Sequence, residues 1–340
     1  MNLNKNERSG IRRTLRLPFF IILLLIGTGI LINITSSNLY KLRKTGSEGF
    51  PDFITANDDY FVTRIGDIPN IDPESYTLTV WGQIDNPRDF TINELYSLNQ
   101  TERILTTECI GNPTNGPLLS TAAWKGFLVY DLIESHGLRS NATGVKYIAA
   151  DGYYVYHTLE QLILNGTIGA LYMNGGILPP VQGFPLRIVN PGSFGAKQPA
   201  WVTEIKIIDM PINDYWDDRG WDTSPPMDVD STIFFPQGSV EVHVGLPLEI
   251  GGAAFGGTRI FIVEYTINDG SNWNQAYINT SIDVDHVWVF WKVLVTFNET
   301  GTYSFYTKAT DIYNNTQPFN DPFKKDGSNS WPRMIINVIN

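Results

Sequence analysis

The pattern of hydrophobic and polar positions changes twice along the chain and divides it into three parts. Residues 17–40 carry no charged side chain and begin with a long apolar run. Between about 57 and 222, short segments that alternate between apolar and polar residues are mixed with a few of helical periodicity. From about 228 to 340, alternating segments recur at short spacing with few helix signals. The pattern predicts an N-terminal segment, an α+β domain and an all-β domain.

In the central part, the pattern predicts strands connected by short helices. Strands are predicted at 76–82, 103–107, 145–150, 170–173, 186–189 and 201–208. Helical signals predict a helix at 92–98, a loop from 124 that enters a helix ending at Gly137, and a helix at 159–165. Thr91 and Glu94 stand at the spacing of a capping box before the first of these helices.

The last part is predicted to be a sandwich of two β-sheets. Examples of its predicted strands are 239–244, 259–267, 287–297 and 302–310. Asp269-Gly270 and the segment 299–301 are typical of hairpin turns. A span of about 110 residues with this spacing is typical of an immunoglobulin-like fold. The stretch 214–230, which is polar, aromatic and rich in proline, is predicted to be a packed connection between the two domains.

The N-terminal segment has the features of a membrane anchor. Its apolar core, residues 18–34, approaches the length of about 20 residues that a spanning helix needs. Five basic residues precede the run and three follow it, which places the N-terminus in the cytoplasm by the positive-inside rule. A cleaved signal peptide is the alternative, but no cleavage site of the Ala-x-Ala type follows. We expect residues 1–45 to hold a single-pass anchor in the cell membrane, with a stalk at 41–56 and an extracytoplasmic catalytic domain.

Composition narrows the class of protein and of partner. Aromatic residues make up 13% of the 340 residues and charged residues only 17%, which is typical of a globular chain with ample core material. The formal net charge is −11. Because phosphate backbones bind to basic surfaces, this acidic balance argues against a nucleic acid as partner.

Cys109 is the only cysteine, and it lies between a predicted strand and a turn rich in Gly, Asn and Pro. A lone thiol cannot form an internal disulfide. It is therefore a small buried hydrophobe, a reactive group or a metal ligand. The residues around it do not by themselves decide between these three roles.

Several separated blocks, taken in their order, resemble the sulfite oxidase family of molybdopterin-dependent oxidoreductases, in particular its membrane-anchored prokaryotic members. The blocks are Thr107–Asn112 with Leu119–Gly126, Met173–Gly175 with Gly183–Arg187, Pro191–Trp201, Tyr215–Trp221, Val263–Trp273 and Ala309–Pro318. The resemblance implies a molybdopterin-binding domain at 57–222 and an immunoglobulin-like dimerisation domain at 228–340. It also implies a molybdopterin cofactor.

The resemblance assigns roles to particular residues. It implies that Cys109 gives a thiolate ligand to molybdenum, which suits a soft sulfur donor. Arg187 matches an arginine that holds the pterin phosphate, although a surface arginine on a strand is the alternative. The loop 192–198 is expected to wrap the same phosphate. The loop residues assigned to the cofactor are Ser193, Gly195, Lys197 and Gln198.

Three further assignments rest on looser matches. Asn112 and Asp151 are expected to reach the cofactor, and each has an ordinary turn as its alternative role. Arg64 is expected to meet both the cofactor and an anionic substrate, with a solvated arginine as the alternative. These residues complete the predicted site.

Departures from the family pattern bear on the substrate. Members that oxidise sulfite carry His where this chain has Gln182, Lys where it has Ala200, and Arg where it has Pro113-Thr114. The lost arginine and histidine remove positive charge from the expected oxyanion pocket, whereas the lost lysine is a phosphate contact that Lys197 or Gln198 could replace. The sequence therefore predicts that doubly charged sulfite is held poorly, while the cofactor is retained.

The sequence predicts a molybdenum-cofactor oxidoreductase that transfers oxygen atoms, in two-electron steps, to or from a small oxyanion or sulfur compound. The chain has no haem attachment motif, and one cysteine cannot hold an iron–sulfur cluster. A separate electron carrier, a cytochrome or a quinone-linked subunit, is expected, and the sandwich domain implies a homodimer. The alternatives are a sulfoxide or methionine sulfoxide reductase of the same fold, or an anchored surface binding protein without cofactor.

Overall fold

The computed structural model describes residues 49–340 except 225 and 280–283. The predicted membrane segment at 17–40 lies outside these residues. Among the helices that are described, none combines the length and apolarity that a membrane crossing requires.

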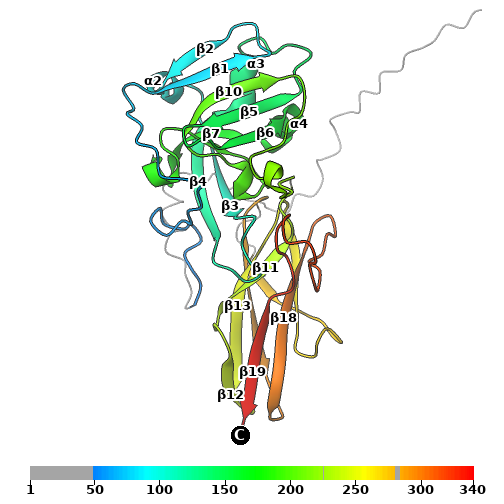
Figure 1. Cartoon of the computed structure of the whole chain (residues 1–340). Helices are drawn as coiled ribbons and strands as arrows, with labels where there is room; N and C mark the ends of the chain where they lie inside the picture. The colour runs from blue at the N-terminus through cyan, green and yellow to red at the C-terminus, as the bar shows by residue number, and fades with distance from the viewer. Residues whose placement is uncertain (1–48, 225, 280–283) are drawn as a thin grey trace, which may run out of the picture.

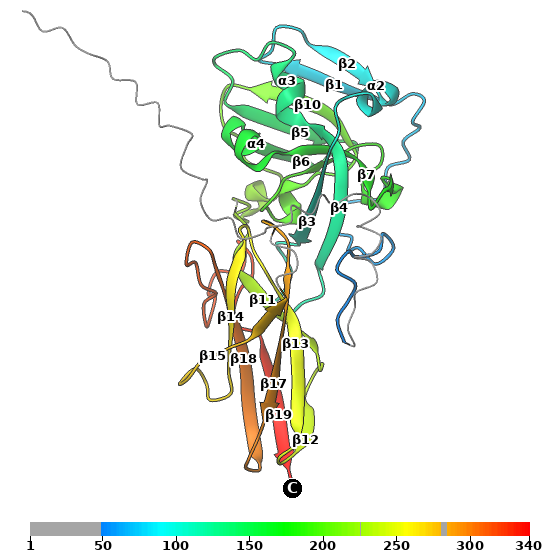
Figure 2. The same cartoon turned by 180° about the vertical axis from the view of Figure 1, so that it is seen from behind.

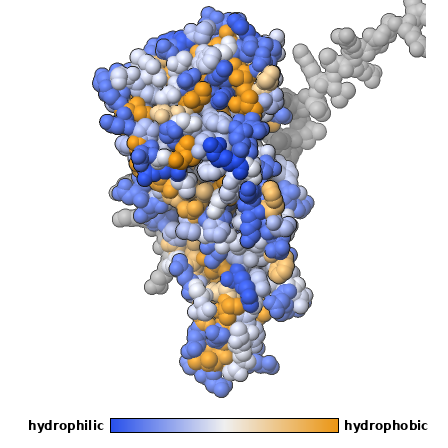
Figure 3. All heavy atoms as spheres, in the orientation of Figure 1, coloured by the Kyte–Doolittle hydropathy of each residue, from blue (hydrophilic) through white to orange (hydrophobic). Residues whose placement is uncertain are grey.

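The described chain forms two domains placed end to end (Figure 1). The first contains β1 to β10 with three short α-helices, and the second contains β11 to β19 and ends at the C-terminus. Figure 2 shows from behind that the β3–β4 hairpin runs from the first domain down to the second. Figure 3 shows that apolar side chains reach the surface of one face in separate groups over both domains.

The first domain is built on two five-stranded sheets. One sheet has the order β2-β1-β10-β5-β6, in which β1 and β10 are parallel and the other neighbours are antiparallel. Its strands are β1 (Thr77–Gly82), β2 (Arg88–Thr91), β5 (Gly144–Ala149), β6 (Tyr154–Thr158) and β10 (Val202–Ile208). Residues 76–82, 145–150 and 201–208 were predicted as strands, and each of these predictions is confirmed within two residues.

The second sheet carries the cysteine loop. It has the order β3-β4-β7-β8, and β9 pairs with β7. Its strands are β3 (Thr101–Glu108), β4 (Leu119–Leu128), β7 (Ile168–Met173), β8 (Gly176–Ile177) and β9 (Arg187–Val189). Pairing of β3 with β4 closes at Glu108 and Leu119, so Cys109 is the first residue beyond the ladder. The hairpin therefore fixes where the thiol is presented.

Three short helices flank these sheets, so the described chain is mostly β. They are α2 (Ile92–Tyr96), α3 (Val129–Glu134) and α4 (Leu159–Asn165). The predicted capping box of α2 is confirmed, because Thr91 Oγ1 accepts from Glu94 N and the Glu94 side chain accepts from Thr91 N. A second capping box, of Thr158 and Gln161, begins α4.

The prediction of a loop that begins at Trp124 is wrong, because residues 124–128 are the end of β4. This strand lies between β3 and β7 and, apart from the exposed Lys125, is buried on both faces, with Trp124 and Phe127 almost without exposed surface. A strand buried on both faces lacks polar alternation and therefore resembles the start of a buried helix.

The second domain is a sandwich of a four-stranded and a five-stranded sheet, in the orders β11-β13-β17-β16 and β12-β19-β18-β14-β15. The strands are β11 (Asp230–Phe235), β12 (Val240–His243), β13 (Pro247–Phe255), β14 (Ile260–Thr266), β15 (Asn274–Gln275), β16 (Tyr277–Asn279), β17 (Val289–Thr296), β18 (Gly301–Asp311) and β19 (Arg333–Ile339). Trp291 and Phe305 are fully buried between the sheets. Asp269 and Gly270 both have positive φ, as the predicted hairpin turn requires.

The two domains share a hydrophobic cluster at their junction. Ile104 and Ile110 come from the first domain, and Phe255 and Trp288 come from the second. The Thr106 Oγ1 atom accepts a hydrogen bond from the Trp288 backbone N–H at 2.8 Å. The junction is therefore packed and hydrogen-bonded.

The chain segment at 49–56 also packs into this junction. Ile54 is 1% exposed, and the Phe50 ring stacks on Phe290 with centroids 5.0 Å apart. Residues 41–56 were predicted to be a stalk. In the described part of that stretch, the apolar side chains bind the segment to both domains, so it is not a free spacer.

Candidate cofactor site

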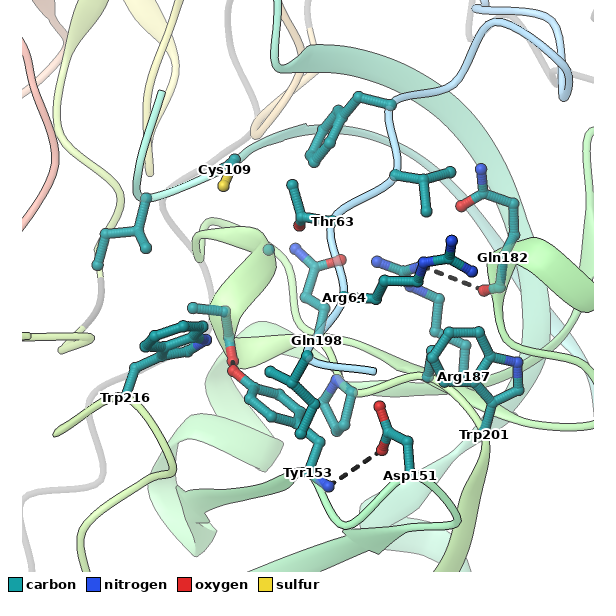
Figure 4. A pocket seen from close by; sticks show the side chains of 18 of the residues that line it. Thr63, Arg64, Cys109, Asp151, Tyr153, Gln182, Arg187, Gln198, Trp201 and Trp216 are labelled. Atoms are coloured by element: carbon teal, nitrogen blue, oxygen red, sulfur yellow. Dashed lines mark hydrogen bonds between the residues drawn. The ribbon is translucent and has the colours of Figure 1, made fainter. Parts of the chain in front are cut away.

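A cavity of about 300 Å³ lies in the first domain beside the cysteine loop (Figure 4). Residues 61–65 precede the first strand, 109–111 follow β3, and 151–153 form the turn between β5 and β6. The segment 181–201 and two tryptophans of the interdomain connection complete the lining. Residues distant in sequence are thus brought to one site.

Cys109 is held by the turn that follows β3. Its N–H donates to the Leu118 carbonyl at 3.0 Å, and its carbonyl accepts from Asn112 N at 2.8 Å. The side chain lies at the cavity, with Thr63 nearby (Figure 4). Burial raises the pKa of the Cys109 thiol, against the opposing hydrogen bonds from the Gly111 backbone and the Thr63 side chain. The thiol is thus favoured in the protein alone, and a bound cation would favour the thiolate.

Arg187, at the start of β9, is the inner cation of the cavity. Its Nη1 donates to the Gln182 carbonyl at 3.1 Å, and its guanidinium lies 5.3 Å from the centre of the Trp124 ring. The Nε atom is buried and has no hydrogen-bond partner. Burial lowers the pKa of Arg187, against an opposing contribution from Tyr60. No carboxylate of the described residues forms an ion pair with it. A guanidinium in this setting is prepared for an anion.

Arg64 is the second cation of the cavity and is exposed at its mouth. In the described part of the chain it forms no ion pair either. Asp151 is the single acidic residue that the described chain contributes to the lining, and its Oδ1 accepts from the Tyr153 backbone N–H at 3.0 Å. The cavity therefore has a positive balance within an acidic protein.

Gln182 and Trp201 shape the wall near Arg187. The Gln182 Nε2 donates to the Tyr60 carbonyl at 3.2 Å, so this amide is engaged within the protein. Trp201 has φ of 56° although it is a bulky residue, a conformation that needs support. The support includes hydrogen bonds from Trp201 Nε1 to the Pro180 carbonyl at 2.8 Å and from Trp201 N to the Gly183 carbonyl at 3.2 Å.

The structure separates the residues of the predicted phosphate loop. Gly195 and Gln198 line the cavity, whereas Ser193 and Lys197 do not. The Ser193 Oγ accepts from Asn190 Nδ2 at 2.7 Å, inside the loop. The Lys197 side chain points away from the cavity, because its Nζ donates to the Tyr156 carbonyl at 2.8 Å and forms a buried ion pair with Asp214. A contact of this loop with a phosphate stays a prediction, and the ammonium of Lys197 is already engaged.

Asn112 also lies outside the cavity lining. Its Nδ2 donates to Glu108 at 2.9 Å and its Oδ1 accepts from Leu118 N at 3.0 Å. These bonds fasten the two ends of the cysteine loop to each other. Its described contacts correspond to the alternative role of a turn residue, and its contact with a cofactor stays a prediction.

Trp216 and Trp221 line the cavity, and sequence reasoning missed them as site residues. They lie in the connection between the domains, with ring centroids 6.2 Å apart. The prediction that this connection packs is confirmed, because Asp214 and Thr223 are each 1% exposed. The segment Tyr215–Trp221 contributed to the family resemblance, but its aromatic side chains were predicted only to pack between the domains.

The residues present fit a molybdopterin cofactor. The unpartnered Nε of Arg187 needs an anion, which the phosphate of the pterin supplies. Cys109 offers one soft ligand, and the described residues contain no cluster of three or more His, Cys, Asp or Glu side chains suited to hold a metal. A metal at Cys109 would take its other ligands from the cofactor.

The comparisons with known proteins agree with this geometry. The family model "Oxidoreductase molybdopterin binding domain" matches residues 65–216, and "Mo-co oxidoreductase dimerisation domain" matches 223–338. Sulfite oxidase of Arabidopsis thaliana is 27% identical over 84% of this chain and 88% of its own length. Nitrate reductase [NADH] 1 of Phaseolus vulgaris is 22% identical over 84% of this chain, which spans 40% of that protein.

Mitochondrial sulfite oxidase of Mus musculus is 25% identical over 84% of this chain, which spans 62% of the mouse protein. Among solved structures, the sulfane dehydrogenase SoxCD from Paracoccus pantotrophus superposes with a TM-score of 0.72 over 84% of each chain at 20% identity, which shows the shared fold. The two family models match consecutive parts of the chain and together cover most of it. Cys109 and most of the cavity lining lie in the part that the molybdopterin-binding model matches. The chain therefore belongs to the sulfite oxidase family of molybdopterin oxidoreductases, with a molybdopterin-binding domain followed by a dimerisation domain.

Proposed function

We propose that this protein carries out two-electron oxygen-atom transfer on a small oxyanion or sulfur compound, outside the cytoplasmic membrane. The observation that supports this most is the meeting of Cys109, Arg187 and Arg64 in one cavity. A metal-ligating thiol, a buried cation for the cofactor phosphate and an exposed cation for a substrate are the parts that such a reaction needs.

The residues of this chain would divide the work as follows. When bound, the molybdenum cofactor supplies the oxygen-atom and electron chemistry. Cys109 would hold the metal, and Arg187 would hold the pterin phosphate. Arg64 orients an anionic substrate at the mouth. Trp201 and Trp216 exclude water from the cavity, which strengthens the attraction between the guanidinium groups and their anions.

Metal analysis tests this function. Purified wild-type protein is expected to contain molybdenum and pterin in equal amounts, and Cys109→Ala to lose most of the molybdenum. Met210→Ala serves as the matched control, because Met210 is 64% exposed and lies outside the cavity lining. A wild-type protein that contains neither molybdenum nor pterin would contradict the proposal and favour a cofactor-free binding protein.

The proposed location rests on the apolar run at 17–40 and on the basic residues before it. The full-length protein is expected in the membrane fraction, with its catalytic domain open to protease added from the outside. Full recovery in the cytoplasm would overturn this location.

The proposed partners follow from what the chain carries. Its single cysteine cannot hold an iron–sulfur cluster, so a cytochrome or a quinone-linked subunit is proposed to take up the electrons. The match of residues 223–338 to a dimerisation domain supports a homodimer. Light scattering on the purified protein is expected to give twice the chain mass, and a monomer at micromolar concentration would contradict it.

A further inference from the structure

The side of the cavity next to Cys109 is apolar and aromatic. Ile110, Trp216 and Trp221 line it. Gly111 marks how close they come: a side-chain carbon at this residue would lie 3.7 Å from the Trp221 ring and 3.9 Å from the Cys109 sulfur. The tryptophan and the sulfur therefore border the same small space, which the glycine leaves open.

Positive charge in the cavity is limited to two guanidinium groups. Among the described residues, the lining includes Arg64 and Arg187 and no lysine or histidine. Arg187 is the inner cation, fixed to the Gln182 carbonyl and packed over Trp124, and it is assigned to the cofactor phosphate. One exposed cation, Arg64, is then left for a substrate.

This balance favours one kind of substrate over another. A doubly charged oxyanion that leaves water needs several charged partners or donors, and here it would meet one guanidinium and an aromatic wall. A molecule with a single negative charge and an apolar group matches both features. Its charged end would meet Arg64, and its apolar group would cover Ile110 and the two indole rings.

We propose, on the basis of the function proposed above, that the substrate is an organic sulfinate, a singly charged sulfur oxyanion with an apolar substituent on sulfur. In the reaction, one S–O bond forms between the sulfinate sulfur and an oxygen that comes from water. The two O–H bonds of that water break, and two protons go to solvent. The bound cofactor would supply this two-electron oxidation, and a one-electron haem carrier would be the acceptor of the two electrons. The product is the sulfonate, which keeps the single negative charge.

Binding of products to the purified holoprotein tests this inference separately from activity. Benzenesulfonate, methanesulfonate and sulfate are titrated by calorimetry, after molybdenum and pterin have been measured in each sample. Wild-type protein is expected to bind benzenesulfonate at least about tenfold more tightly than sulfate, from burial of the ring. Arg64→Gln is expected to weaken both sulfonates alike.

Variants of the aromatic wall, formed by Ile110, Trp216 and Trp221, test whether this wall causes the tighter binding of benzenesulfonate. Trp221→Ala is expected to weaken benzenesulfonate by about tenfold and methanesulfonate by less than about threefold. Trp81→Ala is the matched control, because this indole lies outside the cavity lining beneath Lys206. Gly111→Ala serves if the tryptophan variant does not fold. Its added carbon makes ordinary contacts on both sides and is expected to weaken benzenesulfonate selectively.

The outcomes separate this inference from the function on which it rests. Sulfate binding that equals or exceeds benzenesulfonate binding in molybdenum-loaded protein would overturn the sulfinate assignment and leave the oxidoreductase function in place. Loss of molybdenum from Trp221→Ala, with wild-type loading of Trp81→Ala, would also overturn it, because the indole would then hold the cofactor. Wild-type protein without molybdenum would overturn both.

Discussion

The cavity of the first domain and the Gln317 network of the sandwich treat their buried polar groups in opposite ways. In the sandwich, Gln317 donates from Nε2 to Asp230 at 2.6 Å and accepts at Oε1 from the Ser231 hydroxyl at 2.8 Å and from Ala309 N at 3.1 Å. In the first domain, the Nε of Arg187 is buried at the cavity without a hydrogen-bond partner among the described residues. The Nε1 of Trp124, whose ring lies under the Arg187 guanidinium, is buried without one as well. Buried polar groups are normally paired, so an unpaired group beside a cavity indicates a place for a ligand.

The difference also shows in how charge is distributed. Arg187 lies in the first domain as a cation without a carboxylate, whereas Asp311 in the sandwich accepts from the Thr258 hydroxyl and from Asn315. A hydrogen-bond network in which every buried polar group is paired stabilises the fold. A buried polar group left unpaired lowers stability until a ligand pairs with it. Variants in each region can test this comparison.

The largest expected effect is that of Arg187→Leu on the cofactor. We expect pterin and molybdenum content to fall by at least about tenfold, because the phosphate loses its buried partner. The free energy of unfolding of the cofactor-free protein is expected to change by less than about 1 kcal/mol, since an unpaired buried charge is removed. Mass spectrometry and denaturant titration measure the two effects, with the surface variant Arg139→Leu as control. Normal cofactor content in Arg187→Leu would show that Arg187 does not hold the pterin phosphate.

In the sandwich, Gln317→Ala is expected to have the opposite effects, a large loss of stability with no loss of cofactor. The change breaks the bonds to Asp230, Ser231 and Ala309, and should lower the free energy of unfolding by about 3 kcal/mol. Cofactor content per folded molecule is expected to stay at the wild-type level. A loss below about 1 kcal/mol in urea titration would mean that the sandwich network is not the stabilising one.

At the junction, Thr106→Val probes whether the domains unfold together. The change leaves the buried Trp288 N–H without its acceptor, at a cost of about 2 kcal/mol. Fluorescence and circular dichroism should still report one transition at a lower denaturant concentration. Two separate transitions in the wild type would show that the junction does not couple the domains.

The smallest expected effect is the pH dependence due to Asp228, which lies where the connection enters the sandwich. Burial, together with repulsion from Asp326 and Asp321, raises the pKa of Asp228 from 3.8 to about 6. Because the folded state holds the proton more tightly, stability from this group is present below pH 3.8 and is lost as pH rises through about 6. After allowance for solvent screening, the loss should be about 1 kcal/mol.

Asp228→Asn is expected to be more stable than wild type at neutral pH, and to lose that advantage in acid. Thermal unfolding at several pH values measures the difference between the two proteins. An equal pH dependence in both would assign the effect to other carboxylates.

The sequence predicted the elements that depend on local patterns. The Thr91–Glu94 capping box and the strand at 145–150 follow from cap chemistry and period-two alternation, and both are present in the fold. The position of Cys109 at the end of a strand also followed from the chain. Strand β4 could not be predicted in full, because burial on both faces removes the alternation that marks a strand.

What the sequence by itself determined is therefore the two-domain order, the cysteine loop and the type of cofactor. Only the tertiary structure decided which side chains meet there. It directs Lys197 into an ion pair with Asp214, and brings Trp221 from the connection to a position beside Gly111. The physical reason is that a side chain's partner depends on packing between segments far apart in the chain. Those partners decide whether a charge is free to bind a ligand.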